Sequence, residues 1–164
     1  MKITLLFAIS AGFLTACSPD RPAAAQTPVV WMIAPLHGAL KPGATANLRI
    51  EARIEDGWHI YSITQPAGGP VATRITFPTG QTFESAGNPK PSVQPGVAYD
   101  EAFHMNVELY EKAASFTVPV RRAGATITAP DSVHVNVRYQ VCNASLCFPP
   151  HTAKLAAPVL GTVE

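Results

Sequence analysis

The chain has 164 residues, and its 12 basic and 11 acidic side chains give a formal net charge of only +1. No run of basic residues occurs, which argues against a nucleic-acid-binding surface and against electrostatic attachment to a membrane. The length fits one domain after removal of an export signal.

An apolar run from Ile3 to Ala16 follows Met1 and Lys2. It is too short to span a bilayer and fits the hydrophobic region of a signal peptide. The run ends in Leu14-Thr15-Ala16-Cys17, which resembles the lipobox of bacterial lipoproteins. In such lipoproteins the signal is cut before the cysteine, and its thiol is lipidated. We therefore expect residues 1–17 to form a lipoprotein-type signal peptide with lipobox, with Cys17 as the lipidation site. Conventional cleavage after Ala25 is the alternative.

Residues 18–28 are rich in proline and alanine and predict a tether between a lipid anchor and a domain spanning residues 29–160. The export signal implies the periplasmic side of the membrane, where thiols oxidise unless they are actively reduced. Ser18 follows the cysteine in place of the aspartate that retains lipoproteins at the inner membrane, which favours the outer membrane.

Period-two alternation of apolar and polar residues predicts several strands. In chain order these are Val29–Ile33, Leu48–Ile54, His59–Tyr61, Thr73–Phe77, Ser115–Val120, Ala125–Thr128, Ser132–Cys142 and Thr152–Ala156. Many short strands with turns between them, and no sustained helical period, predict an all-β antiparallel sandwich. Cys142 falls on the polar side of the alternation in its strand, so we expect an accessible sulfur.

The segment from Ala98 to Met105 is amphipathic and aromatic without clean alternation. From the residues alone, Tyr99 and Phe103 are interpreted as core residues of an edge strand.

Cys142 and Cys147 are the only cysteines that follow the signal segment. Their spacing is too wide for the CxxC motif of a thioredoxin helix and suits two positions that flank a tight β-hairpin loop. A disulfide between them closes a very short ring, worth roughly 2 kcal/mol in the chain-entropy model, against about 4.7 for a ring of about 100 residues. The disulfide would therefore stabilise the fold little and would suit a redox switch, because it can open while the domain stays folded.

Two other interpretations of the pair stay open. One is an ordinary stabilising disulfide in an exported domain, which a reduction potential below about −300 mV would favour. The other is copper or zinc binding, since His151 completes a C-x4-C-x3-H pattern of two thiolates and one imidazole. A fourth ligand is not evident, so we assign no metal site.

The segment Tyr139-Gln140-x-Cys142-x4-Cys147-Phe148-Pro149-Pro150 resembles the YQxC…CYPP signature of the periplasmic N-terminal domain of DsbD-type thiol:disulfide interchange proteins. Three further stretches agree with this family in order and spacing. Ile54–Tyr61 is similar to its DGYYLY strand, Phe103 matches its loop aromatic, and Ser115–Val120 matches the strand after that loop. The resemblance covers roughly residues 30 to 158.

This resemblance implies an immunoglobulin-like β-sandwich whose cysteine pair relays electrons from a thioredoxin-like donor to periplasmic disulfide proteins, without a cofactor. Cys147 corresponds to the cysteine that forms mixed disulfides, and Cys142 would resolve them. Phe103 corresponds to the aromatic of a cap loop that shields the thiols, and Glu101 to an acidic position beside it. For Tyr61, packing around the cysteine pair and packing in the core are both open.

The chain departs from the family pattern in three ways. Four residues separate the cysteines, where the best-known members have five. Ala102 stands between Glu101 and the aromatic, and the second acidic residue, Asp100, lies one step earlier. The sequence ends at Glu164 without an electron-importing or thioredoxin-like domain, so we expect a disulfide-reductase-type relay served by a separate membrane electron importer.

Overall fold

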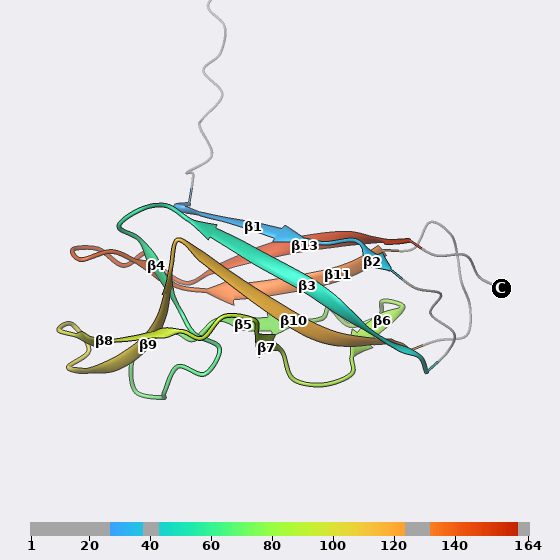
Figure 1. Cartoon of the computed structure of the whole chain (residues 1–164), viewed down its shortest axis with the longest axis horizontal. Coiled ribbons are helices and arrows are strands. Elements are labelled where there is room, and N and C mark those ends of the chain that lie inside the picture. Colours follow the sequence, from blue (N-terminus) through green and yellow to red (C-terminus); the bar gives the residue numbers. More distant parts are fainter. Residues whose placement is uncertain (1–26, 38–42, 124–131, 161–164) are drawn as a thin grey trace, which may run out of the picture.

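The computed structural model describes residues 27–37, 43–123 and 132–160, and every regular element in these ranges is a β-strand (Figure 1). In the part of the chain that is described, no helix is long and apolar enough to cross a membrane. The strands are β1 Val29–Ile33, β2 Leu36–His37, β3 Thr45–Ile54, β4 His59–Tyr61, β5 Arg74–Thr76, β6 Phe83–Ser85, β7 Lys90–Pro91, β8 Gly96–Asp100, β9 Met105–Glu111, β10 Ala113–Arg122, β11 Ser132–Tyr139, β12 Val141–Cys142 and β13 His151–Leu160.

Two sheets form the sandwich. One has the order β1-β3-β10-β6, with β7 also paired to β10, and the other has the order β2-β13-β11-β5. All of these pairs are antiparallel except the short parallel pair of β2 with β13. The main apolar core lies between the sheets and includes Leu48 and Ile50 of β3 with Val133 and Val135 of β11. The predicted all-β antiparallel sandwich is thus confirmed.

A third sheet, with the order β12-β4-β9-β8, extends from one end of the sandwich (Figure 1). Its central strands continue directly from sandwich strands: β4 follows β3 after a turn at Gly57, and β9 leads into β10 at Lys112. β8 forms the outer edge, and four of its five residues are exposed. This end sheet carries the predicted site residues.

The alternation of side chains gives the end sheet two different faces. Val141, Ile60 and Tyr110 lie side by side on three strands, and all three are buried in a second apolar cluster at the end of the sandwich. The neighbouring row is Cys142, His59 and Glu111, which must point to the opposite face. One face therefore completes the core, and the other is available for a site.

Most predicted strands are present. Val29–Ile33 and His59–Tyr61 coincide with β1 and β4, and the predicted strands at Leu48–Ile54, Ser115–Val120 and Thr152–Ala156 lie within β3, β10 and β13. The strand predicted at Thr73–Phe77 is shorter, as β5. The strand predicted at Ala125–Thr128 lies outside the described residues.

The single strand predicted for Ser132–Cys142 is wrong. β11 ends at Tyr139, and β12 pairs with β4 in a different sheet. Gln140 lies at the change of sheet, where its side chain accepts a hydrogen bond from Val71 N and donates one to Phe148 O. The change of partner also overturns the expected accessibility of Cys142, whose residue is only 1% exposed.

We predict that Lys112→Gly keeps or raises the free energy of unfolding by up to about 1 kcal/mol, whereas Lys112→Val lowers it by about 1 to 2 kcal/mol. Lys112 has a φ of 62°, a left-handed backbone that glycine adopts freely and β-branched residues resist. Urea unfolding of both variants measures the difference. Lys154→Val, at an exposed strand position, is the matched control and should be nearly neutral. Equal effects of the two valine substitutions would contradict the prediction.

Candidate redox site

Cys142 and Cys147 form a disulfide across a tight hairpin, with their Cα atoms 4.1 Å apart. Two backbone hydrogen bonds frame it, from Asn143 N to Leu146 O at 2.9 Å and from Phe148 N to Val141 O at 3.0 Å. The Asn143 side chain fixes the loop, because its Oδ1 accepts hydrogen bonds from Ser145 N at 2.9 Å and Leu146 N at 2.8 Å. The predicted placement of the pair on either side of a hairpin loop is confirmed.

The two cysteines differ sharply in exposure. Cys142 is 1% exposed and packs with Tyr61 and Val107 in a small apolar cluster. Cys147 is exposed at the far side of the hairpin. A sulfur from another molecule therefore has access to Cys147 rather than to Cys142.

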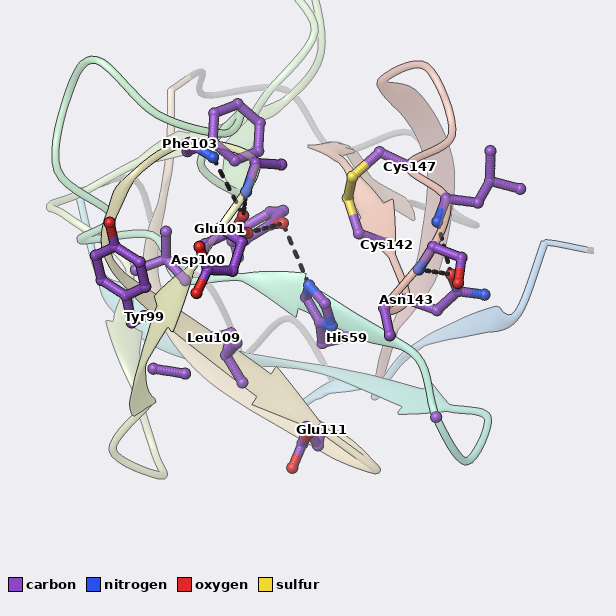
Figure 2. A pocket seen from close by; sticks show the side chains of 18 residues that line it. His59, Tyr99, Asp100, Glu101, Phe103, Leu109, Glu111, Cys142, Asn143 and Cys147 are labelled. Atoms are coloured by element: carbon purple, nitrogen blue, oxygen red, sulfur yellow. Dashed lines mark hydrogen bonds between the residues drawn. A yellow bond between two sulfur atoms is a disulfide. The ribbon is translucent and has the colours of Figure 1, made fainter.

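A cavity of about 720 Å³ lies beside the disulfide (Figure 2). Its floor is the free face of the end sheet, and its walls are the loop after β8 on one side and the cysteine hairpin on the other. Of the residues predicted for the site, it brings together Tyr61, Glu101, Phe103, Cys142 and Cys147. Cys17 lies outside the described residues.

Asp100 ties the loop after β8 to the cavity floor. Its Oδ1 accepts hydrogen bonds from Ala102 N at 2.9 Å and Phe103 N at 3.3 Å, and its Oδ2 accepts one from the Tyr61 hydroxyl at 3.2 Å. Glu101 is exposed on the rim of the cavity. The family resemblance implies a loop carboxylate at Glu101, whereas the contacts that organise the loop in the structure are made by Asp100, one position earlier.

Phe103 is half-buried in the turn between β8 and β9 and meets the Tyr61 ring edge-on, with centroids 6.5 Å apart. In Figure 2 it lies across the cavity from Cys147. The edge strand expected around Tyr99 exists as β8, but Tyr99 is 57% exposed, so neither aromatic is a strand residue of the core.

Tyr61 and His59 form the polar part of the floor. His59 Nε2 lies 3.2 Å from the Tyr61 hydroxyl. Burial, together with the charge and hydrogen bond of Asp100, raises the pKa of Tyr61, so it remains a neutral phenol. Burial lowers the pKa of His59 despite the opposing charges of Asp100 and Glu111, which favours a neutral imidazole at neutral pH. His59 was not singled out from the sequence, although its place two residues before Tyr61 on a strand put both on one face.

Aromatic contacts support the hairpin from the other side. Trp58 stacks on Phe148 with ring centroids 5.3 Å apart, so Trp58 braces the residue after Cys147. The His151 ring lies against Tyr139 and Phe148. Within the described ranges, no three His, Cys, Asp or Glu side chains are grouped so that they could hold a metal ion.

Comparison with known proteins identifies the fold and the family. The family model "Thiol:disulfide interchange protein DsbD, N-terminal" matches residues 36–158. The reduced N-terminal domain of Neisseria meningitidis DsbD is similar in structure, with 20% identity, a TM-score of 0.50 and coverage of 70% of this chain and 78% of that chain. The N-terminal periplasmic domain of ScsB from Proteus mirabilis has 15% identity and a TM-score of 0.55, over 87% of this chain and 49% of that chain. No curated protein sequence matches the chain.

At these identities the structural likeness shows the fold, which is the immunoglobulin-like sandwich that the family resemblance implied. The family match extends over more than half of the chain and includes the whole end sheet and both cysteines. The chain therefore belongs to the family of DsbD N-terminal domains.

Proposed function

We propose that this domain performs thiol–disulfide exchange through a reversible Cys142–Cys147 disulfide, and relays electrons from a thioredoxin-like donor to periplasmic disulfide proteins. The observation that carries the proposal is the unequal exposure of the two cysteines at the edge of an open cavity. Membership of the DsbD N-terminal family supports the same chemistry.

In the proposed reaction the reduced pair transfers two electrons to a client disulfide. Cys147, as the thiolate, attacks one client sulfur, which forms a mixed disulfide and releases the other client sulfur as a thiolate. Cys142 then loses its proton and attacks the Cys147 sulfur, so the Cys142–Cys147 bond forms and the second client thiolate leaves. The donor restores the pair by the reverse sequence. In that reverse sequence the donor thiolate attacks Cys147 rather than Cys142, because the exposed sulfur can be reached along the S–S axis.

The loop after β8 would act as a cap. Phe103 already faces the disulfide across the cavity, and a small movement of the loop would place the ring over Cys147. Such a cover slows reaction with small oxidants and leaves exchange to partners that displace the loop.

We propose that the domain works on the periplasmic side of the membrane, held by a lipid on Cys17 at the outer membrane, and that a separate membrane protein imports the electrons. The lipobox-like sequence before Cys17 supports the anchor. The similarity to the periplasmic domain of ScsB supports the compartment.

We predict that Cys142→Ser accumulates a covalent complex with a thioredoxin-fold partner, because the mixed disulfide on Cys147 cannot be resolved internally. Cys147→Ser should accumulate none. Trapping from periplasmic extract, read on non-reducing gels, measures both variants against the wild type. Complexes formed only by Cys147→Ser would reverse the two roles. If neither variant traps a partner under a supply of reductant, the pair is an inert structural disulfide and the proposed function is wrong.

Phe103→Ala should leave the fold intact and speed oxidation of the reduced pair by hydrogen peroxide about tenfold, the change that corresponds to about 1.4 kcal/mol of lost shielding. Stopped-flow oxidation gives the rates. Tyr99→Ala, on the same hairpin but already exposed, is the matched control and should oxidise at the wild-type rate. An unchanged rate combined with a large loss of stability would make Phe103 a packing residue instead.

Lipidation of Cys17 predicts a membrane-extracted protein whose mass is that of the chain from residue 17 onward plus a diacylglycerol. Intact mass spectrometry of the detergent extract measures it, and Cys17→Ser should release the protein into the soluble fraction. A soluble mature protein that begins at Gln26 would instead show conventional cleavage after Ala25.

A further inference from the structure

His59 is the side chain that the sheet places directly beside Cys142. In the antiparallel pairing of β12 with β4, Cys142 is opposite His59, and Val141 is opposite Ile60. Side chains at opposed positions project from the same face of a sheet, with their Cβ atoms about 4.5 to 5.5 Å apart. Both residues line the cavity, and Figure 2 shows the imidazole on its floor below the disulfide.

The hydrogen bonds on the floor determine which nitrogen of His59 carries the proton. The Tyr61 hydroxyl has one proton, and it donates this proton to Asp100 Oδ2 at 3.2 Å. The 3.2 Å contact between His59 Nε2 and the same hydroxyl then requires Nε2–H to donate to the phenol oxygen. In a neutral imidazole this leaves Nδ1 with a free lone pair, able to accept a proton.

Cys142 needs such an acceptor. Its residue is 1% exposed and packs against Tyr61 and Val107, so solvent does not reach its sulfur readily. A thiol enclosed by apolar groups gives up its proton reluctantly, because the thiolate loses solvation there. The exposed Cys147 has no such requirement, since water can take its proton.

We propose that His59 accepts the proton of Cys142 during resolution of the mixed disulfide, a role that rests on the exchange function proposed above. The Cys142 proton passes to His59 Nδ1 as the sulfur attacks Cys147. The Cys142–Cys147 bond forms, the bond between Cys147 and the client sulfur breaks, and the departing client thiolate takes up a proton from the imidazolium or from water. Tyr61 and Asp100 hold the imidazole in the required tautomer.

The charged groups around His59 suit this role. Glu111 is its cross-strand neighbour on β9, Asp100 reaches it through Tyr61 from the end of β8, and Glu101 lies on the rim of the same cavity. Burial lowers the pKa of His59, and the charges of Asp100 and Glu111 oppose that shift, so these two carboxylates stabilise the imidazolium that forms. The imidazole is therefore neutral before the transfer and stabilised after it.

The test uses the reduced domain and a limiting amount of Ellman's reagent in a stopped-flow spectrophotometer. The first thionitrobenzoate is released by Cys147, and the second is released when Cys142 resolves the mixed disulfide. In His59→Gln the second step should slow by about 10²-fold near neutral pH, the typical effect of losing one proton acceptor, and the first step should keep its rate. His59→Tyr, which keeps an aromatic ring and a polar group on the strand, should slow the second step equally.

The pH profile separates proton transfer from a merely structural role. In the wild type, the second step should fall as pH drops through the pKa of His59, because an imidazolium accepts no proton. In both variants that inflection should disappear, and the rate should keep rising above about pH 8.5, the range in which an ordinary thiol ionises unaided. His134→Gln, a histidine of β11 outside the cavity, is the matched control and should preserve both rates and the profile.

Three contradicting outcomes can be distinguished. If the wild type resolves the mixed disulfide and the His59 variants keep its second-step rate and inflection, the role of His59 is wrong while exchange stands. If the wild type never releases the second thionitrobenzoate and Cys142→Ser traps no partner, the exchange function itself is wrong. Slowing of both steps alike in correctly folded variants would also overturn the proposal, because it would indicate a general disturbance of the hairpin.

Discussion

The two-residue pairing of β12 with β4 is the interaction on which the site depends. It places Val141 and Ile60 in the core and turns Cys142 and His59 to the cavity. A slip of β12 by one residue would turn Val141 to the cavity and Cys142 to the core, while β4 would keep its faces through its pairing with β9. The apolar cluster behind the sheet therefore fixes the chemistry in front of it, because only one register satisfies both faces.

Hydrogen bonds connect the cavity floor to the loop after β8, which faces the disulfide. His59, Tyr61 and Asp100 form a continuous chain, and Asp100 also holds the backbone that carries Phe103. Movement of the loop away from the sheet would break the bond between Tyr61 and Asp100 and expose a carboxylate and a phenol to water. Because each hydrogen bond contributes only about 1 kcal/mol net, displacing the loop would cost only a few kcal/mol, as the cap role proposed for it requires.

The sequence was most informative where alternation was long and local. Alternation predicted β3 from Leu48–Ile54 and β10 from Ser115–Val120, and these two strands form the long central pair of one sheet. The change of sheet at Gln140 was not predictable, since alternation continues through it although the partner strand changes. Asp100 was missed as a site residue because its contact with Tyr61 joins β8 to β4, two strands that do not pair with each other. His59 was missed because its place beside Cys142 follows from the pairing of β12 with β4, which was not predicted.

The disulfide lies where it contributes little to the stability of the fold. Both cysteines lie outside the two apolar clusters that hold the sandwich together, and the hairpin loop keeps its own hydrogen bonds through Asn143. Opening so short a ring costs roughly 2 kcal/mol in the chain-entropy model, against the 5 to 15 kcal/mol by which domains are typically stable. A bond that contributes so little to the fold can be made and broken repeatedly, whereas the same bond between the two sheets of the sandwich would couple every exchange event to the stability of the whole domain.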